Sequence, residues 1–119
     1  MAFADEISSN PNHDGRTLNP RDAAVNRLAA TILFTSLGKT MLYEGQEFLR
    51  SKWRINDTYN RGDAVNAIRW TDRDRPLARE TLDYYTGLSH LRTSEEGASF
   101  RVASRPPSTY YRWILPSNP

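Results

Sequence analysis

Three groups of polar side chains in this sequence have types and spacing that could do chemistry. His13 and Asp14 stand together just before a glycine, where the imidazole could hydrogen-bond a ligand and the carboxylate could stabilise positive charge. The other interpretation is an ordinary turn, which Asn, Asp and Gly favour. Glu44 and Glu47 could be taken for a pair of acid/base carboxyl groups. We favour a loop acid and an acid at the start of a helical turn, where the helix dipole stabilises it.

The third group lies in a long polar loop between residues 53 and 70. Tyr59, Asn60, Asp63 and Asn66 could line a binding site, since an aromatic ring can stack on a ligand and amides can bond to hydroxyls. Asp and Asn also bond readily to nearby backbone, so the loop could equally be knitting itself together. A loop of this length in a small domain is usually functional or disordered, and its aromatic residues favour function.

Two amphipathic patterns must position these groups. Residues 21–37 are predicted to form a helix, which Asn19 caps and Pro20 begins, and residues 77–93 a second one. Between them, residues 39–43 read as a short strand that is apolar on both faces, which is typical of a central parallel strand. Residues 100–119 contain strand-forming aromatic and branched side chains. The order helix, strand, loop, helix predicts an α/β fold with two main helices and few short strands.

Composition limits the class of protein. The 119 residues suffice for one small domain, and the mean hydropathy of -0.72 indicates little apolar surface to bury. The net charge is +2, and the lysines and arginines are interspersed with acids rather than clustered, so no nucleic-acid partner is expected. The chain has no cysteine, and His90 has no second ligand at helical spacing, so we expect no metal site and no cofactor. No segment is long and apolar enough for a signal peptide or a membrane span, so a cytoplasmic location is expected.

Four motifs, in order and at matching spacing, resemble the debranching branch of the α-amylase-type glycoside hydrolases, which includes pullulanase, isoamylase and glycogen-debranching enzymes. They are NHDG at residues 12–15, the apolar helix at 23–37, MLYEGQEFLRSK at 41–52 and TYNRGDAVNAIRW at 58–70. The resemblance covers residues 12–100. It implies a fragment of a (β/α)8 TIM barrel, from about strand 7 to helix 8, followed by the start of a C-terminal β domain. The implied domains are residues 1–97 and 98–119.

The resemblance also implies retaining hydrolysis of α-glucosidic bonds, which uses two carboxyl groups, one as nucleophile and one as acid/base. Asp14 matches a third carboxylate that stabilises the transition state, and His13 matches a residue that contacts the sugar. The substrate contacts implied or considered are His13, Glu44, Tyr59, Asn60, Asp63 and Asn66.

The family's nucleophile and acid/base have no counterpart in this sequence, because they follow earlier strands of the barrel. We therefore expect a fragment of an α-glucan debranching hydrolase, truncated at both ends and inactive alone. Its partners would be an α-glucan and the missing N-terminal half of the barrel. The alternative is a non-catalytic module that binds glucan or another protein.

Overall fold

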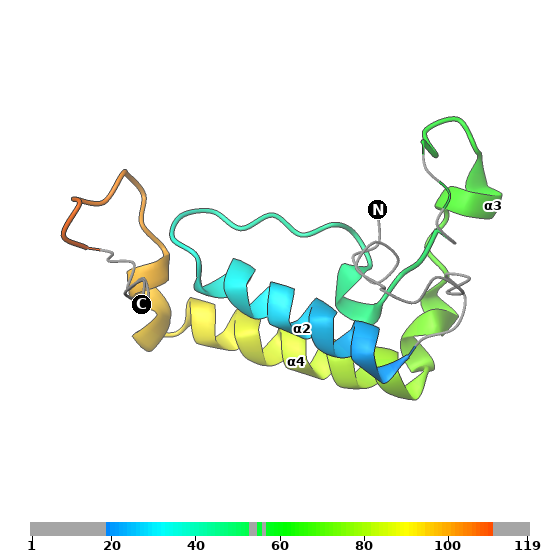
Figure 1. The fold of residues 1–119 in the computed structure, drawn as a ribbon, viewed down its shortest axis with the longest axis horizontal. Coiled ribbons are helices and arrows are strands. Elements are labelled where there is room, and N and C mark those ends of the chain that lie inside the picture. Colours follow the sequence, from blue (N-terminus) through cyan, green and yellow to red (C-terminus); the bar gives the residue numbers. More distant parts are fainter. Residues whose placement is uncertain (1–18, 53–54, 56, 111–119) are drawn as a thin grey trace, which may run out of the picture.

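Two long helices that run in the same direction, side by side, form the centre of the molecule. The computed structural model describes residues 19–52, 55 and 57–110. Figure 1 shows helix α2 (Pro20–Thr35) lying along helix α4 (Pro76–Thr93), with the other elements attached at the two ends of this pair. Those elements are a single helical turn, α3 (Asp63–Asn66), and three 3-10 turns, η1 (Gln46–Phe48), η2 (Trp70–Asp74) and η3 (Glu96–Phe100).

Helix α2 begins where the sequence predicts. The side chain of Asn19 accepts a hydrogen bond from the backbone N–H of Asp22 at 2.9 Å, and Pro20 occupies the first turn. An N-cap of this kind satisfies one of the backbone donors that a helix start leaves free. The predicted helix at residues 21–37 is therefore confirmed, with its end two residues earlier, at Thr35. The second predicted helix, at residues 77–93, is confirmed as α4.

The two helices meet over a small core. Ala30 and Phe34 of α2 pack against Tyr85 and Leu88 of α4, and the rings of Phe34 and Tyr85 meet edge to face with centroids 5.9 Å apart. Polar contacts flank this core, because Thr31 and Tyr84 share a hydrogen bond of 2.7 Å. A second small cluster joins the two helices to the segment between them through Ala23, Leu49 and Leu77.

The α/β prediction is wrong, because the described residues contain helices and turns and no β-strand. The described residues thus do not show a barrel fragment or the strands of a β domain. Residues 39–43 are extended, but the one described backbone bond to them is a turn bond, from the N–H of Gln46 to the carbonyl of Tyr43. A strand exists only through ladder pairing with a neighbouring strand, and no described residue supplies it. Residues 101–110 form turns and irregular backbone, while the rest of the expected β domain, residues 111–119, lies outside the described residues.

The face of α2 that packs on α4 is not the one that its apolar pattern emphasises. The sequence places Val25, Leu28, Ala29, Ile32 and Leu33 on one side of the helix. The structure instead buries Ala23, Ala30 and Phe34, and leaves Leu28 and Ile32 each 61% exposed. At 100° per residue these two leucine-sized side chains point away from α4. The outer stripe of α2 is therefore apolar and uncovered.

Arg92 ties the ends of the two helices together. Its buried guanidinium donates to the carbonyl oxygens of Phe34 in the last turn of α2, of Ser36 and Gly38 just after it, and of Phe100 in η3. The carbonyls at the end of a helix lack intrahelical donors, so a planar group with several N–H bonds is well suited to satisfy them. Arg92 thus substitutes for a C-terminal cap of α2.

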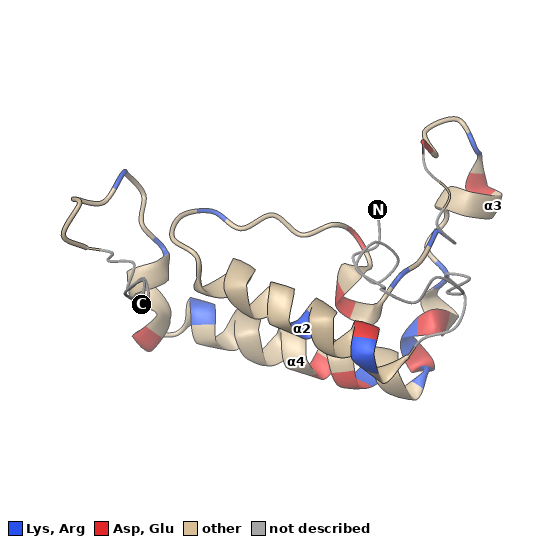
Figure 2. Cartoon of the chain, in the orientation of Figure 1, with Lys and Arg blue, Asp and Glu red and all other residues tan. Residues whose placement is uncertain are grey.

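Charged residues of both signs are distributed along the described part of the chain (Figure 2). They gather around η2 and the start of α4, where the carboxylate of Asp72 lies 3.0 Å from Arg69 and 2.7 Å from Arg75. Within the described part of the chain, no helix combines the length and the hydropathy that crossing a membrane requires.

Candidate functional site

The candidate site is built where the extended segment turns into η1. Gly45 has a φ of +84°, a conformation that glycine adopts without strain, and its carbonyl accepts the backbone N–H groups of Phe48 and Arg50. A Cβ at Gly45 would lie only 2.7 Å from the Cβ of Arg50. The turn therefore needs a glycine both for its backbone angle and for the side chain of Arg50 that packs against it.

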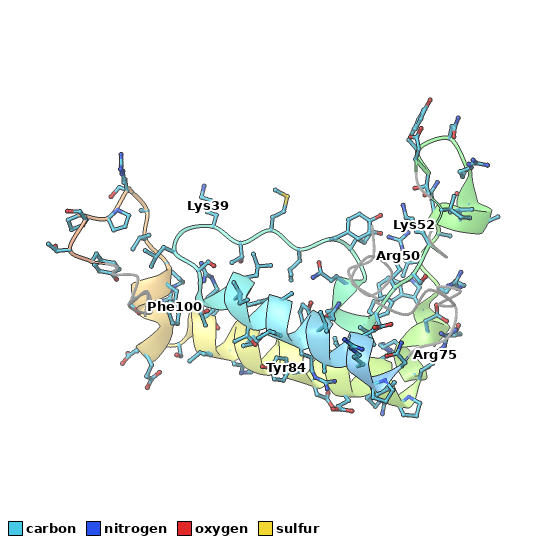
Figure 3. All side chains as sticks on the ribbon, viewed as in Figure 1. Lys39, Arg50, Lys52, Arg75, Tyr84 and Phe100 are labelled. Atoms are coloured by element: carbon cyan, nitrogen blue, oxygen red, sulfur yellow. The ribbon has the colours of Figure 1, made fainter. Side chains whose placement is uncertain are left out.

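Arg50 and Lys52 both lie close to the ring of Tyr43. The Arg50 guanidinium lies 5.7 Å and the Lys52 ammonium 5.6 Å from the ring centroid, both within the range of a cation–π interaction. Figure 3 shows the two cations at the junction between the segment at residues 39–45 and the polar loop. Arg50 is only 5% exposed and donates to the carbonyl oxygens of Glu44 and Asn66. The ion pairs found among the described residues involve neither cation.

Lys52 attaches the polar loop to this junction. Its ammonium donates to the hydroxyl of Thr58 and to the side-chain oxygen of Asn66, each at 2.9 Å. The amide of Asn66 in turn donates to the carbonyl of Thr58 at 2.7 Å. These hydrogen bonds hold the two ends of residues 57–66 together, and we call this segment the braced loop.

The tip of the braced loop carries three of the predicted site residues. Tyr59 is 84% exposed, and Asn60 and Asp63 are exposed beside it in the sequence. The phenol ring, the amide and the carboxylate are groups that can stack on, and hydrogen-bond to, a ligand rich in hydroxyls. Asn66 has a different position, because its side chain faces inward and holds the base of the loop.

The remaining predicted residues are distributed as follows. Glu44 is exposed at the turn before η1, and its backbone carbonyl shares the guanidinium of Arg50 with Asn66. Glu47 lies in η1, as the helical-turn interpretation expected. His13 and Asp14 lie outside the described residues. The structure thus brings Glu44 and Asn66 together through Arg50.

Sequence reasoning missed the residues that do the bracing, which are Tyr43, Arg50, Lys52 and Thr58. An aromatic residue followed by two cations at residues 50 and 52 is no recognisable motif, since the three meet only because the turn at Gly45 folds the chain back. Among the described residues, no cluster of His, Asp and Glu is arranged to hold a metal ion.

A buried polar chain supports the site from below. Gln46 donates to the hydroxyl of Tyr85 at 3.1 Å, and that hydroxyl donates to the side-chain oxygen of Asn26 at 2.9 Å. Burial raises the pKa of Tyr85 to about 12, although the hydrogen bond from Gln46 acts in the opposite direction. These hydrogen-bonded side chains join η1 to both long helices, so they hold in place the turn that carries Arg50.

The described residues therefore form a small helical unit from which the braced loop projects. Over 84 residues the chain is 30% identical to the pullulanase of Bacillus subtilis (strain 168). This match covers 71% of the chain and 11% of the length of that relative. No protein-family profile matches the chain. No solved structure matches it either.

Proposed function

We propose that this chain is part of a pullulanase-type glycoside hydrolase and contributes a glucan contact rather than the whole active site. The observation that supports this is the similarity to the Bacillus subtilis pullulanase over 84 residues. Because the chain spans only 11% of that relative, the rest of the active site would have to come from other polypeptide. The expected ligand is an α-glucan.

The braced loop supplies the contact in this proposal. Tyr59 is the most exposed ring of the described residues that bear on the site, and the hydrogen bonds of Lys52 and Asn66 hold the loop that carries it. A ring that is already held loses little conformational freedom when a sugar stacks on it. Asn60 and Asp63 would then bond to sugar hydroxyls.

Asp14 is the proposed transition-state stabiliser and His13 a proposed sugar contact. In this proposal both act only when a nucleophile and an acid/base from other polypeptide are present, since retaining hydrolysis needs both of those carboxyl groups. The chain by itself would therefore bind glucan and not cleave it.

The alternative function is a non-catalytic module that binds glucan or another protein. The exposed stripe of Leu28 and Ile32 favours it, because apolar side chains left uncovered on one helix face are common at interaction surfaces. The two proposals share the braced loop and differ in whether the chain contributes to hydrolysis.

A chimera separates them. The matched region of the Bacillus subtilis pullulanase is replaced by the corresponding residues of this chain, and hydrolysis of pullulan is measured. We expect activity above that of the Asp14→Asn version of the same chimera. A soluble chimera whose activity does not depend on Asp14 would contradict the catalytic proposal. The non-catalytic binding module would then be the favoured function. Turnover of pullulan by the unmodified chain alone would contradict its expected inactivity.

Glucan binding is tested by calorimetric titration of the chain with maltotriose. We expect saturable binding that Tyr59→Ala weakens about fivefold, since stacking on an aromatic ring contributes on the order of 1 kcal/mol. The matched control is Tyr110→Ala, which removes another exposed tyrosine, outside the braced loop. Equal effects of the two substitutions, or no saturation by the wild-type chain, would exclude the braced loop as the contact.

A further inference from the structure

The backbone of the braced loop forms two separate turns. In the first turn, residues 58–61, the N–H of Arg61 donates to the carbonyl of Thr58 at 3.0 Å. In the second turn, residues 62–66, the N–H of Asn66 donates to the carbonyl of Gly62 at 3.0 Å. No backbone hydrogen bond among the described residues links one turn to the other. The position of one turn relative to the other therefore depends on side chains.

Lys52 contacts both turns from outside the loop. Its Nζ donates to Oγ1 of Thr58 in the first turn and to Oδ1 of Asn66 in the second, each at 2.9 Å. Arg50 also reaches the loop, but only at the carbonyl of Asn66 in the second turn. Within the described part of the chain, Lys52 is thus the side chain outside the loop that hydrogen-bonds to both turns.

The ammonium of Lys52 is itself held in place. It lies 5.6 Å from the ring centroid of Tyr43, and the carbonyl of Tyr43 accepts from the N–H of Gln46 at 3.0 Å in the turn that leads into η1. Hydrogen bonds from a charged donor are roughly twice as strong as those between neutral groups. The charge of Lys52 is therefore well placed to fix the loop to the helical part of the molecule.

The two turns carry different members of the proposed glucan contact. Tyr59 directly follows Thr58 in the first turn, whereas Asp63 belongs to the second. We propose that Lys52 is a positioning residue for this contact, because its ammonium fixes Tyr59 relative to Asp63 without touching the ligand. A contact that is ordered before binding loses less conformational freedom when the ligand arrives. This inference rests on the proposed glucan contact.

Restoring the ammonium chemically tests the proposal. The chain has no cysteine, so Lys52→Cys provides a single thiol. Alkylation with 2-bromoethylamine rebuilds a side chain of nearly the length of lysine that ends in an ammonium, whereas iodoacetamide adds a neutral amide. Lys52→Cys should raise the dissociation constant for maltotriose about fivefold, as Tyr59→Ala does, because it acts through that ring. The aminoethylated form should return to within about twofold of the wild type, and the amide form should stay weak.

Two further measurements separate positioning from a general loss of structure. In the Tyr59→Ala background, Lys52→Cys should change the dissociation constant less than about twofold, since residues that act through one another are not additive. Without glucan, Lys52→Cys should speed hydrogen exchange in residues 57–66 and leave exchange in α2 and α4 unchanged. Aminoethylation should slow the exchange of the loop again.

The matched control is Lys39→Cys, which replaces an exposed lysine of the extended segment (Figure 3). Neither this substitution nor its two alkylations should change glucan binding. A wild-type chain that does not saturate with maltotriose would overturn the glucan contact and the positioning role together. If Tyr59→Ala weakens binding and Lys52→Cys does not, the contact stands and the positioning role is wrong. Equal binding by the two alkylated forms, additive effects of the two substitutions, or loss of helical circular dichroism in Lys52→Cys would also overturn the role of Lys52.

Discussion

At the scale of single residues, Tyr85 is the side chain on which the packing of the two helices most depends. Its ring meets Phe34 in the core, while its hydroxyl joins Gln46 of η1 to Asn26 of α2. The side-chain nitrogen of Asn26 has no hydrogen-bond partner in the described structure, so the buried polar chain is incompletely satisfied. A polar chain of this kind is sensitive to any change in the charge of its central hydroxyl.

Alkaline pH should therefore weaken the fold through Tyr85. Its folded-state pKa is raised from 10.0 to about 12, so the neutral phenol contributes stability below pH 10 that is lost as the pH rises from 10 to 12. A shift of this size corresponds to about 2–3 kcal/mol. Urea unfolding at several pH values between 9 and 12 measures the loss. Tyr85→Phe should reduce this dependence, whereas Tyr84→Phe, which removes a partly exposed hydroxyl that bonds to Thr31, should retain it. Equal slopes would refute the assignment.

Arg92 provides a second prediction at this scale. Arg92→Met keeps much of the aliphatic volume but removes the donors for the carbonyls of Phe34, Ser36, Gly38 and Phe100. Buried acceptors left unpaired should lower the free energy of unfolding by about 2–3 kcal/mol. The control is Arg79→Met, which removes an exposed ion pair of 3.6 Å with Asp74 and should change stability by less than about 1 kcal/mol. Denaturant titration would contradict the proposed cap if both variants lost the same amount.

At the scale of elements, the turn at Gly45 determines whether the braced loop is held. Gly45→Ala must strain a backbone at φ +84° and also displace Arg50, whose Cβ and Cδ would each lie 2.7 Å from the new Cβ. Gly62→Ala is the matched control, because its φ is +67° but nothing lies within 4 Å. Both should lose about 1 kcal/mol from the backbone. Only Gly45→Ala should also speed hydrogen exchange in residues 57–66, and equal exchange in the two variants would exclude Arg50 as the brace.

The elements also show how far the sequence predicts this fold. Asn19, Pro20 and the helical period suffice to predict α2 and α4, because capping and periodicity are local properties. The prediction of a strand at residues 39–43 is wrong, because a strand forms only beside another strand and a local sequence pattern does not show whether one is present. The apolar stripe of Leu28 and Ile32 misleads for the same reason: a sequence records which face is apolar, not which face finds a partner.

The candidate site was predicted only in part. Polar and aromatic residue types are sufficient to single out the loop that carries Tyr59, and the structure places that ring in solvent. The sequence left open whether Asn66 contacts a ligand or its own loop, and its bonds to Lys52 and Thr58 favour the second interpretation. The roles of Arg50 and Lys52 could not be predicted, since they depend on a turn that brings both cations to Tyr43.

At the scale of the whole molecule, few large apolar side chains are buried among the described residues. The buried apolar residues include several alanines, and the larger ones are Phe34, Phe48, Leu49, Tyr85 and Leu88. Apolar burial must offset an ordering cost of about 1–2 kcal/mol per residue, so a core of this size leaves a small net stability. Other apolar side chains are exposed to solvent instead, on the extended segment at residues 39–43 and on the outer stripe of α2.

A single core truncation should therefore unfold the chain. Leu88 is 9% exposed and packs in the cluster with Ala30, Phe34 and Tyr85, whereas Leu91, one turn later on α4, is 44% exposed. Leu88→Ala should cost about 2–4 kcal/mol, which is comparable to the whole stability of so small a core, and should abolish the cooperative thermal transition seen by circular dichroism. Leu91→Ala leaves the core unchanged and should cost less than about 1 kcal/mol. If Leu88→Ala still melts cooperatively at a temperature close to that of Leu91→Ala, the α2–α4 core does not hold the molecule together.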